Sequence, residues 1–476
     1  MDDPSDAKRQ RTLNGSQMYG YSAGILGQIL PSTLINSYLT IFFTYTVGLN
    51  PLLVGIGTAL GSMVNAISGP VFGYISDKKK LGRLGKRRVF LIYGLPGLIL
   101  ALILVWKPPL TNEMGAYDFG SAVYLWIFII AFYINYSMIR SPYLALLPDQ
   151  SQNEKNRVKI SSIQGIFSIL ASVIGILLPM ILQSLLDNPA VNGKFHESEN
   201  GQILLRSLPW IAFVFGLISA AFTVWAFFSV DESHHKSSDS DLDTSDKSKM
   251  GAKSVLRSLF LPFRDKAFLR FLLSILALNM GMRLILKDLA PYFELVLMFD
   301  GNAFVYFAVG LLPFAGIGFI FWNKKAKSWG LKKTYLRSNL SIALALLSSF
   351  GLIFIDKPLI RTTLALITLG MAVFGLVPGY ILPNPIISYF TDNIPQELKG
   401  QSMQDTGNAA GTYFGSYLFT LNVANAMGDV FLGILLMGTI DGVPSAESPV
   451  MIALIMPIAA VMYYISLRIM KKSKLK

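Results

Sequence analysis

Twelve apolar segments, arranged as six, a polar linker and six more, constrain this 476-residue chain more than any other feature. About 20 apolar residues in a helix cross the hydrocarbon core of a bilayer, where only helices and closed barrels satisfy their own backbone polar groups. The first six lie near residues 17–46, 51–75, 89–106, 122–147, 160–185 and 207–230. The second six lie near 267–298, 303–322, 335–355, 361–390, 402–437 and 450–469. The pattern predicts an all-α membrane protein of twelve transmembrane helices in two six-helix halves.

The stretch between the two sets of segments is polar and rich in Ser, Asp and Lys, a composition that cannot support a packed core. Only 14% of the chain is charged, whereas soluble proteins have about a quarter. The predicted organisation is a cytoplasmic tail (1–16), an N-terminal half (17–230), a cytoplasmic linker (231–266), a C-terminal half (267–469) and a second cytoplasmic tail (470–476).

The positive charges gather on one side of the predicted membrane. With the N-terminus inside, the inner segments hold 33 of the 41 Lys and Arg residues, and the outer loops hold five. Because positive loops collect on the cytoplasmic side, both termini are predicted to be cytoplasmic. The net charge of +13 then reflects orientation and contact with anionic membrane lipids. We therefore expect a multi-pass protein of the cell membrane with no nucleic-acid partner.

Several kinds of chemistry lack the residues they need. The chain has no cysteine, which excludes disulfides, thiolate catalysis and cysteine metal sites. Its histidines, His196, His234 and His235, all fall in predicted loops, and no Gly-Lys-Ser nucleotide-binding loop occurs. We expect no enzyme activity, no cofactor and no metal site, and we expect a monomer.

A basic loop follows the second segment of each half. Residues 73–88 read GYISDKKKLGRLGKRR, and residues 318–333 read GFIFWNKKAKSWGLKK, about 245 positions later. A parallel repeat of two six-helix halves is the layout of major facilitator transporters, whose substrate site lies near the membrane midplane. The alternative, that tight inner loops are simply basic, stays open.

Short motifs in order along most of the chain carry a more specific resemblance. They are Tyr19-Gly20, Val47-Gly48-Leu49, Asn65-Ala-Ile-Ser-Gly69-Pro70, Gly82-Arg-Leu-Gly-Lys-Arg-Arg88, Arg140-Ser-Pro142-Tyr-Leu-Ala-Leu-Leu-Pro148-Asp149 and Leu382-Pro383-Asn384. Through them the chain resembles the glycoside–pentoside–hexuronide cation symporters, the melibiose permease group of the major facilitator superfamily. The resemblance implies the major facilitator fold and the transport of a small solute.

The chain departs from that family where the family binds its coupling cation. The family's pattern has two aspartates on the second span and one on the fourth, and the matching residues here are Asn65, Gly69 and Arg140. Sodium prefers oxygen ligands, and a guanidinium group would repel it. We therefore predict that the usual sodium site is absent. Uniport, exchange and proton coupling through Asp405 or Asp288 stay open.

Charged residues within spans are functional candidates, because burying an unpaired charge costs at least about 2.5–3.5 kcal/mol. Arg140 on the fourth span and Asp405 on the eleventh lie at a similar depth, and we predict that they pair across the halves as an inner gate. The alternative is that Arg140 extends to lipid phosphate or water.

The seventh span holds a second charged group. Arg283 and Lys287 share a helix face at a spacing of four, with Asn279 one turn before Arg283. This face is a candidate site for an anionic or polyhydroxylated substrate. Alternatively, Asp288 and Glu294 neutralise the cations locally, and the cluster is structural.

Uncharged polar residues within spans are candidates for recognising hydroxyl groups. They are Asn36, Tyr38, Asn65, Asn135, Gln164, Asn279, Asn384 and Asn408. Each has the alternative of a purely structural hydrogen bond between helices.

Together these features predict a secondary transporter that moves a small polar solute, a sugar or glycoside, by alternating access and without the family's sodium site. Two alternatives stay open: a transporter of an anionic solute or lysolipid, motivated by the cations within spans, and a non-transporting sensor or scaffold. Asp77, Arg83 and Arg88 resemble the superfamily's latch for the conformational switch, which a static scaffold would not need.

Overall fold

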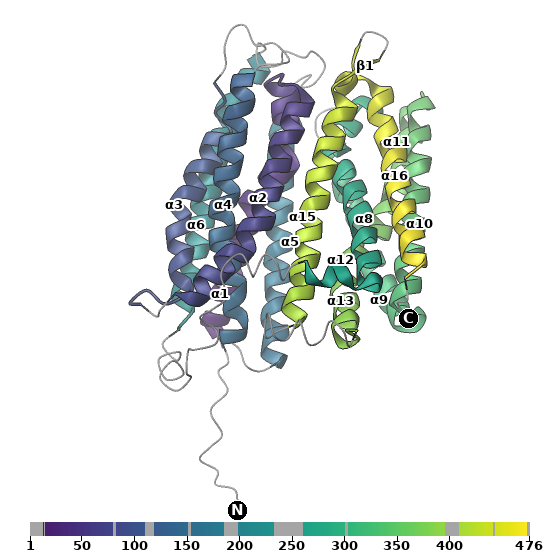
Figure 1. The fold of residues 1–476 in the computed structure, drawn as a ribbon. Helices are drawn as coiled ribbons and strands as arrows, with labels where there is room; N and C mark the ends of the chain where they lie inside the picture. Colours follow the sequence, from purple (N-terminus) through teal and green to yellow (C-terminus); the bar gives the residue numbers. More distant parts are fainter. Residues whose placement is uncertain are drawn as a thin grey trace, which may run out of the picture.

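The computed structural model describes Leu13 and residues 15–79, 82–109, 119–150, 154–184, 199–232, 260–299, 303–395, 409–440 and 443–473. It is almost entirely helical, with two groups of long helices side by side (Figure 1), and the predicted all-α class is confirmed. The first group consists of α1 (Gly15–Ile41), α2 (Pro51–Lys78), α3 (Arg88–Val105), α4 (Phe119–Gln150), α5 (Glu154–Ser184) and α6 (Glu199–Ser229). The second consists of α8 (Lys266–Pro291), α9 (Ala303–Trp329), α10 (Leu331–Ser349), α11 (Pro358–Leu376), α12 (Pro378–Ile381), α13 (Pro383–Asp392), α15 (Ala409–Leu436) and α16 (Pro449–Lys471).

Three of these helices begin at polar N-caps that the sequence supplies. The side chain of Asn50 accepts a hydrogen bond from the backbone N–H of Leu52 at 2.9 Å, and Asp265 and Ser448 cap α8 and α16 in the same way. Pro51 and Pro449 occupy the first helical position, where the missing N–H costs nothing.

The first helix of each half ends in the same unusual way. Helix α1 continues into a π-helical turn over Phe42–Thr46, and α8 continues into one over Tyr292–Val296. Two residues beyond each turn, φ is positive, at 76° for Gly48 and 55° for Met298. These matching ends, 250 positions apart, are a structural repeat of one half in the other.

The two basic loops that look alike in sequence differ in structure. Between α2 and α3, Gly82 and Gly85 form an isolated bridge in a true loop. In the second half α9 continues to Trp329, and only Gly330, with φ of 80°, separates it from α10. The second copy has Lys327 where the first has Gly82, and lysine sustains a helix that glycine weakens. The similarity of the two loops in sequence therefore does not extend to their shape.

A small hairpin marks one end of the bundle, at the top of Figure 1. Strand β1 (Thr439–Ile440) pairs antiparallel with β2 (Val443–Pro444) between α15 and α16. We call this the hairpin end, and we call the opposite end, where the labelled C-terminus lies, the C-terminal end.

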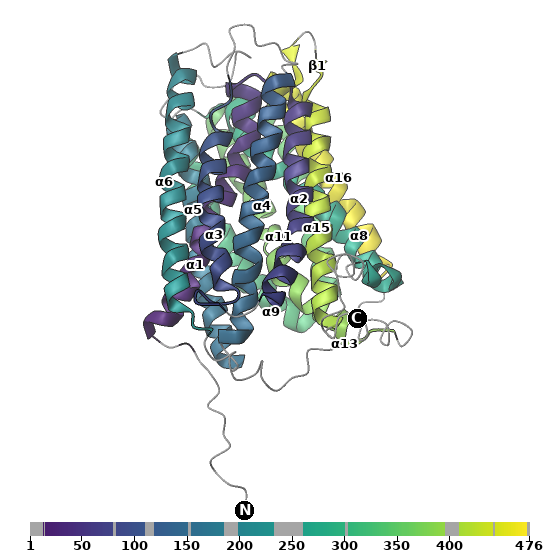
Figure 2. The same cartoon turned by 60° about the vertical axis from the view of Figure 1, so that its left-hand side comes forward.

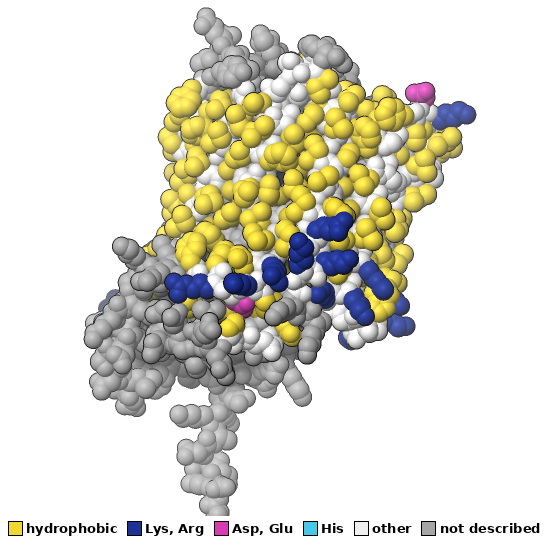
Figure 3. Space-filling model, turned by 45° about the vertical axis from the view of Figure 1, so that its right-hand side comes forward, with side chains coloured by type: hydrophobic (Ala, Val, Ile, Leu, Met, Phe, Trp, Pro, Cys, Tyr) yellow, Lys and Arg dark blue, Asp and Glu magenta, His cyan; other side chains and the backbone are white. Residues whose placement is uncertain are grey.

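Most of the surface is suited to lipid. Ten helices among the described residues are long and apolar enough to cross a membrane, and α5 contains a shorter apolar stretch, Ile163–Ile176. Large apolar side chains such as Phe228, Ile320 and Phe354 are about three-quarters exposed. Figure 3 shows this apolar band with Lys and Arg side chains gathered below it, toward the C-terminal end. The chain is a multi-pass membrane protein.

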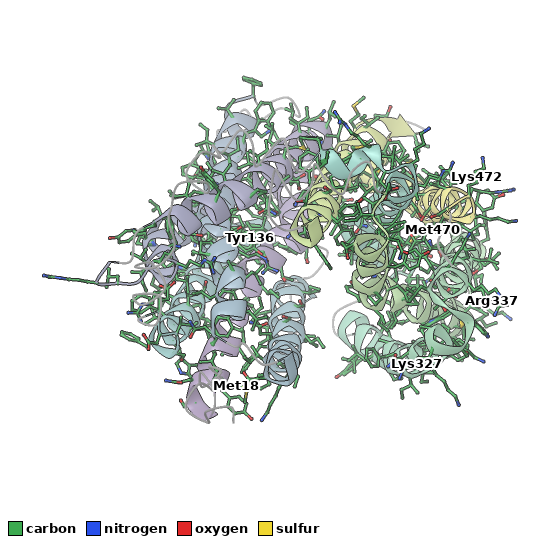
Figure 4. All side chains as sticks on the ribbon, turned by 60° about the horizontal axis from the view of Figure 1, so that its bottom comes forward. Met18, Tyr136, Lys327, Arg337, Met470 and Lys472 are labelled. Atoms are coloured by element: carbon green, nitrogen blue, oxygen red, sulfur yellow. The ribbon has the colours of Figure 1, made fainter. Side chains whose placement is uncertain are left out.

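The two halves approach each other most closely along α2 and α15, which lie side by side in Figures 1 and 2. A Cβ atom at Gly55 would lie 2.5 Å from the carbonyl oxygen of Asp429, and one at Gly433 would lie 2.7 Å from that of Pro51. Small residues allow helix backbones to approach in this way within membranes. Seen from the C-terminal end in Figure 4, Met18 and Lys327 mark the two separate groups of helices.

Candidate functional site

A buried ion cluster lies in the C-terminal half, between α8 and α15. Nε and Nη2 of Arg283 donate to the two carboxylate oxygens of Asp429 at 2.8 and 3.1 Å. The Nζ of Lys287, one turn along α8, lies 2.8 Å from Oδ1 of the same carboxylate. All three residues are at least 93% buried. Two cations therefore share one carboxylate, which leaves the cluster with one positive charge in excess.

The N-terminal half supplies the remaining hydrogen-bond partners of these cations. Nη2 of Arg283 also donates to Oδ1 of Asn36 on α1, at 3.0 Å. The Nζ of Lys287 donates to the hydroxyl oxygens of Thr40 on α1 and Thr58 on α2, at 2.7 and 3.4 Å. The charged pairs thus belong to one half, and their neutral partners belong to the other. We call these five residues and Asp429 the ion cluster.

A second polar contact between the halves lies nearer the centre of the bundle than the ion cluster does. Nδ2 of Asn65 on α2 donates to Oδ1 of Asn422 on α15 at 3.0 Å. Oδ1 of Asn65 accepts a hydrogen bond from the hydroxyl of Ser137 on α4 at 2.9 Å, and Ser68 is bonded to Ser137 in turn. Asn65, one of the positions where the resembling family has an acid, therefore takes part in a neutral amide and hydroxyl network.

At the hairpin end, the hydroxyl of Tyr45 donates to the backbone oxygen of Ala446 at 2.8 Å. The hydrogen bonds that the described residues make between the halves thus lie at the middle and the hairpin end of the bundle. These polar contacts can be exchanged for water without exposing a large apolar core.

Asp288 follows Lys287 in sequence but does not join the ion cluster. Its side chain is 2% exposed, and neither carboxyl oxygen has a hydrogen-bond partner among the described residues. It lies in the last turn of α8, next to the π-helical turn that begins at Tyr292.

Other predicted residues lie elsewhere. Nε2 of Gln164 donates to the Tyr143 hydroxyl, within the N-terminal half. Tyr38 is buried with its ring 6.4 Å from that of Trp106. Asn279 donates back to the carbonyl of Ile275 in its own helix. For Gln164, Tyr38 and Asn279 the structure therefore displays packing or local bonding rather than a shared site.

Arg140 lies on α4, in the N-terminal half. Its guanidinium is 5.7 Å from the Tyr136 ring, and its Nη1 is buried without a hydrogen-bond partner among the described residues. Asp405, its predicted partner, and Asn408 lie outside the described residues, as do the side chains of Asn384 and Asp77. The predicted pair stays a prediction.

The basic loop after α2 is held by an acid at the end of α6. The carboxylate of Glu232 accepts hydrogen bonds from the backbone N–H groups of Lys86, Arg87 and Arg88, at 2.7 to 3.3 Å. Arg88 also donates to the carbonyl of Val230, and its guanidinium lies 5.0 Å from the Phe227 ring. These contacts of Arg88 stay within the N-terminal half, and Arg83 is exposed.

Sequence reasoning missed three residues that matter here. Asp429 is an acid within the eleventh apolar segment, so the rule applied to Arg283 would have found it. Asn422 lies two turns earlier on the same helix, where an amide gives a weaker signal. Glu232 was assigned to the linker, and only the fold reveals that it binds the loop. Among the described residues no group of three or more His, Asp or Glu is placed to hold a metal ion.

The fold and these contacts define the class. The chain superposes on the D-xylose–proton symporter with a TM-score of 0.59 at 15% identity, over 94% of this chain and 97% of that one. It superposes on the nucleoside transporter NupG with a TM-score of 0.61 at 12% identity, over 97% and 100% of the two chains. The chain therefore shares the fold of this class of transporter.

Within that class the sequence decides the family. Residues 20–469 match the family described as MFS/sugar transport protein, and the chain belongs to it. The predicted relationship to the melibiose permease group is confirmed. The isoprimeverose transporter of Lactiplantibacillus pentosus is 24% identical over 37% of this chain and 36% of its own length. The sodium-dependent lysophosphatidylcholine symporter 1 of Gallus gallus is 21% identical over 80% of this chain and 71% of its own.

The uncharacterized symporter sll1374 of Synechocystis sp. (strain ATCC 27184 / PCC 6803 / Kazusa) is 27% identical over 36% of this chain. The matched region spans 31% of that relative's length, and 42% of the length of the Bacillus subtilis symporter YnaJ.

Proposed function

We propose that the protein is a secondary transporter that moves a sugar or glycoside across the cell membrane by alternating access of its two halves. The observation that carries this proposal is the set of hydrogen bonds between the halves in which no ion pair takes part. They run from Asn65 to Asn422 and from Arg283 and Lys287 to Asn36, Thr40 and Thr58. Rocking of the halves would break these contacts while leaving the charged pairs of Asp429 intact. Transport of isoprimeverose and xylose, as the names of two similar proteins state, supports a sugar as the solute.

The proposed topology has twelve spans with both termini cytoplasmic. Helices α5 and α9 add two spans to the ten apolar helices, and α11, α12 and α13 form a single span broken at Pro378 and Pro383. The gathering of Lys and Arg near the C-terminal end supports a cytoplasmic location for that end. The hairpin end then faces outward, and this conformation is closed to the outside. The halves, residues 17–230 and 267–469, are proposed to move as units within a monomer.

Transport without the family's sodium site is supported by the environment of Asn65. Both ends of its amide are engaged by neutral groups, Asn422 and Ser137. An amide supplies one oxygen and no negative charge, a poor replacement for carboxylates as ligands of a cation.

Uptake into proteoliposomes tests this proposal. A panel of labelled sugars and glycosides is supplied with and without an imposed sodium gradient. Uptake of a sugar at the same rate in both conditions is expected. A strict sodium requirement would refute the absence of a sodium site, and no uptake across the panel would refute the sugar proposal itself.

A second candidate solute is anionic, either a sugar acid or a lysolipid phosphate. The excess positive charge of the ion cluster favours it, because a ligand anion could replace the neutral partners of Lys287 when the outer side opens. The Lys287→Met variant leaves a balanced Arg283–Asp429 pair, so it should weaken uptake of an anion selectively. Equal loss for neutral and anionic solutes would argue against this candidate.

At the inner end, Arg140 is proposed to pair with Asp405 when that side closes. The buried Nη1 atom of Arg140, which has no hydrogen-bond partner among the described residues, supports a role for an acid there. Single changes, Arg140→Asp or Asp405→Arg, should abolish uptake. The double variant should restore part of it, and a double variant as inactive as each single would refute the pair.

A further inference from the structure

Asp288 is an ionisable group within a span that the proposed transport cycle leaves without a role. Its carboxyl group is 98% buried, and both oxygens lack hydrogen-bond partners among the described residues. An ionised carboxylate in such a place would lose its hydration without gaining a hydrogen bond or a counter-ion. A protonated carboxyl group carries no charge and so loses much less.

Among the described residues, the neighbouring cations form their ion pairs with Asp429 and not with Asp288. Lysine has three N–H donors, and those of Lys287 are directed to Asp429, Thr40 and Thr58. Arg283 is likewise engaged by Asp429 and Asn36. The sequence suggests that Asp288 balances Lys287, but the fold gives that task to Asp429, on another helix.

The other titratable groups around Asp288 offer no positive charge. Tyr45, at the end of α1, and Tyr292, after α8, lie within electrostatic reach of its carboxyl group. Glu294 and Glu447 act on the same Tyr45. Helix α16 also packs against α8, and there the Tyr463 hydroxyl contacts the sulfur of Met282. Helix α15 contributes Asp429, whose charge Arg283 and Lys287 compensate.

We infer that Asp288 binds a proton from the outer solution as the outer side closes, so that closing of the hairpin end requires protonation of this carboxyl group. On opening, water reaches the carboxyl group and the proton can leave it. Protonation forms one O–H bond on a carboxylate oxygen and consumes one proton from solution. If the proton is instead released to the inside, inward movement of a proton accompanies that of the solute. This last step rests on the proposed transport function, whereas the closing step does not.

The chain is well suited to a direct test of closing, because it contains no native cysteine. Spin labels on Lys107→Cys and Lys357→Cys, two exposed residues flanking α3 and α11, report the separation of the two halves at the hairpin end. We expect the ratio of closed to open protein to rise by up to about tenfold per unit decrease in pH, the slope for one proton. The titration should extend from about pH 9 to pH 5, since buried carboxyl groups titrate within this range.

The Asp288→Asn variant keeps the shape of the side chain and removes its charge. Its ratio of closed to open protein should not change with pH, while Asp356→Asn, which removes an exposed acid near the same end, should keep the wild-type slope. If the spin-label distances in the wild-type protein do not change with pH, the inference is overturned. This measurement needs no Asp288 variant. An Asp288→Asn protein that responds to pH like the wild type would overturn it too.

Transport assays separate this inference from the proposed function. Solute counterflow measures exchange without a proton gradient, whereas accumulation driven by a pH gradient requires coupling. Asp288→Asn should retain counterflow. Its pH-driven accumulation should fall at least about tenfold, which corresponds to about 1.4 kcal/mol. Absence of counterflow in the wild-type protein would refute transport of that solute and leave the pH-dependent closing to stand on the label distances. Full pH-driven accumulation by Asp288→Asn would refute the coupling role of Asp288.

Discussion

Arg283 and Asp429 form a two-point ion pair, in which Nε and Nη2 of the guanidinium each donate to a different carboxylate oxygen, 146 positions apart in the chain. Both residues belong to the C-terminal half, so the pair can persist while the halves move. Its geometry gives the first of four predictions.

Replacing Asp429 by asparagine should strongly destabilise the protein, because it leaves Arg283 and Lys287 buried without a counter-ion. Removing one partner of a buried pair costs about 3–5 kcal/mol. The measurement is the thermal unfolding midpoint in detergent, with Asp356→Asn as the control for loss of an exposed acid. Adding Lys287→Met to Asp429→Asn should recover part of the loss. A single variant as stable as the wild type would show that the cluster contributes nothing to stability.

Thr40→Val should open the hairpin end without disturbing the charged pairs. It removes a hydroxyl acceptor of Lys287 at constant shape, and leaving a buried donor unsatisfied costs about 1–3 kcal/mol. In the open state water would replace that acceptor, so the equilibrium should shift toward open by about tenfold or more. Spin-label distances between positions 107 and 357 report the shift. Thr363→Val, at an exposed position whose hydroxyl bonds within its own helix, is the control. Equal effects of the two changes would contradict the prediction.

Gly55→Ala should also disfavour the closed state. The added methyl group would lie 2.5 Å from the carbonyl oxygen of Asp429 on α15, so the helices must separate. Overpacking of this kind costs about 1–3 kcal/mol. Gly73→Ala, on the same helix with no atom within 4 Å of the added carbon, should have little effect. The same label distances distinguish the two variants. An unchanged closed population in Gly55→Ala would show that α2 and α15 accommodate the added methyl group without destabilising the closed state.

Met298→Gly should stabilise the second half. Met298 adopts a φ of 55° where the first half has Gly48 at 76°, and left-handed backbone costs a residue with a side chain about 1–2 kcal/mol. Its side chain is 63% exposed, so little burial is lost. The unfolding midpoint should rise for Met298→Gly and fall for Gly48→Ala. A fall for both would mean that the contact between the Met298 sulfur and Arg361 outweighs the strain.

Much of this fold was predictable because membrane helices are specified locally. Apolar length, N-caps such as Asn50 and Asp265, and prolines such as Pro378 set the helices from neighbouring residues alone. Charge also marked Arg283, Lys287 and Asp288 as candidates, since any ionisable residue in lipid stands out. The similar basic loops differ in shape, because one glycine more or less decides whether a helix continues.

The sequence by itself determined the family, the helices and the charged residues of α8. Only the tertiary structure decided which charges meet. Lys287 and Asp288 are adjacent in the chain but point in different directions on the helix, so Lys287 reaches Asp429 on α15 while Asp288 is left without a partner among the described residues. The partners of the α8 cations come from α1, α2 and α15, and they are brought together by packing between helices distant in sequence, which no local pattern encodes.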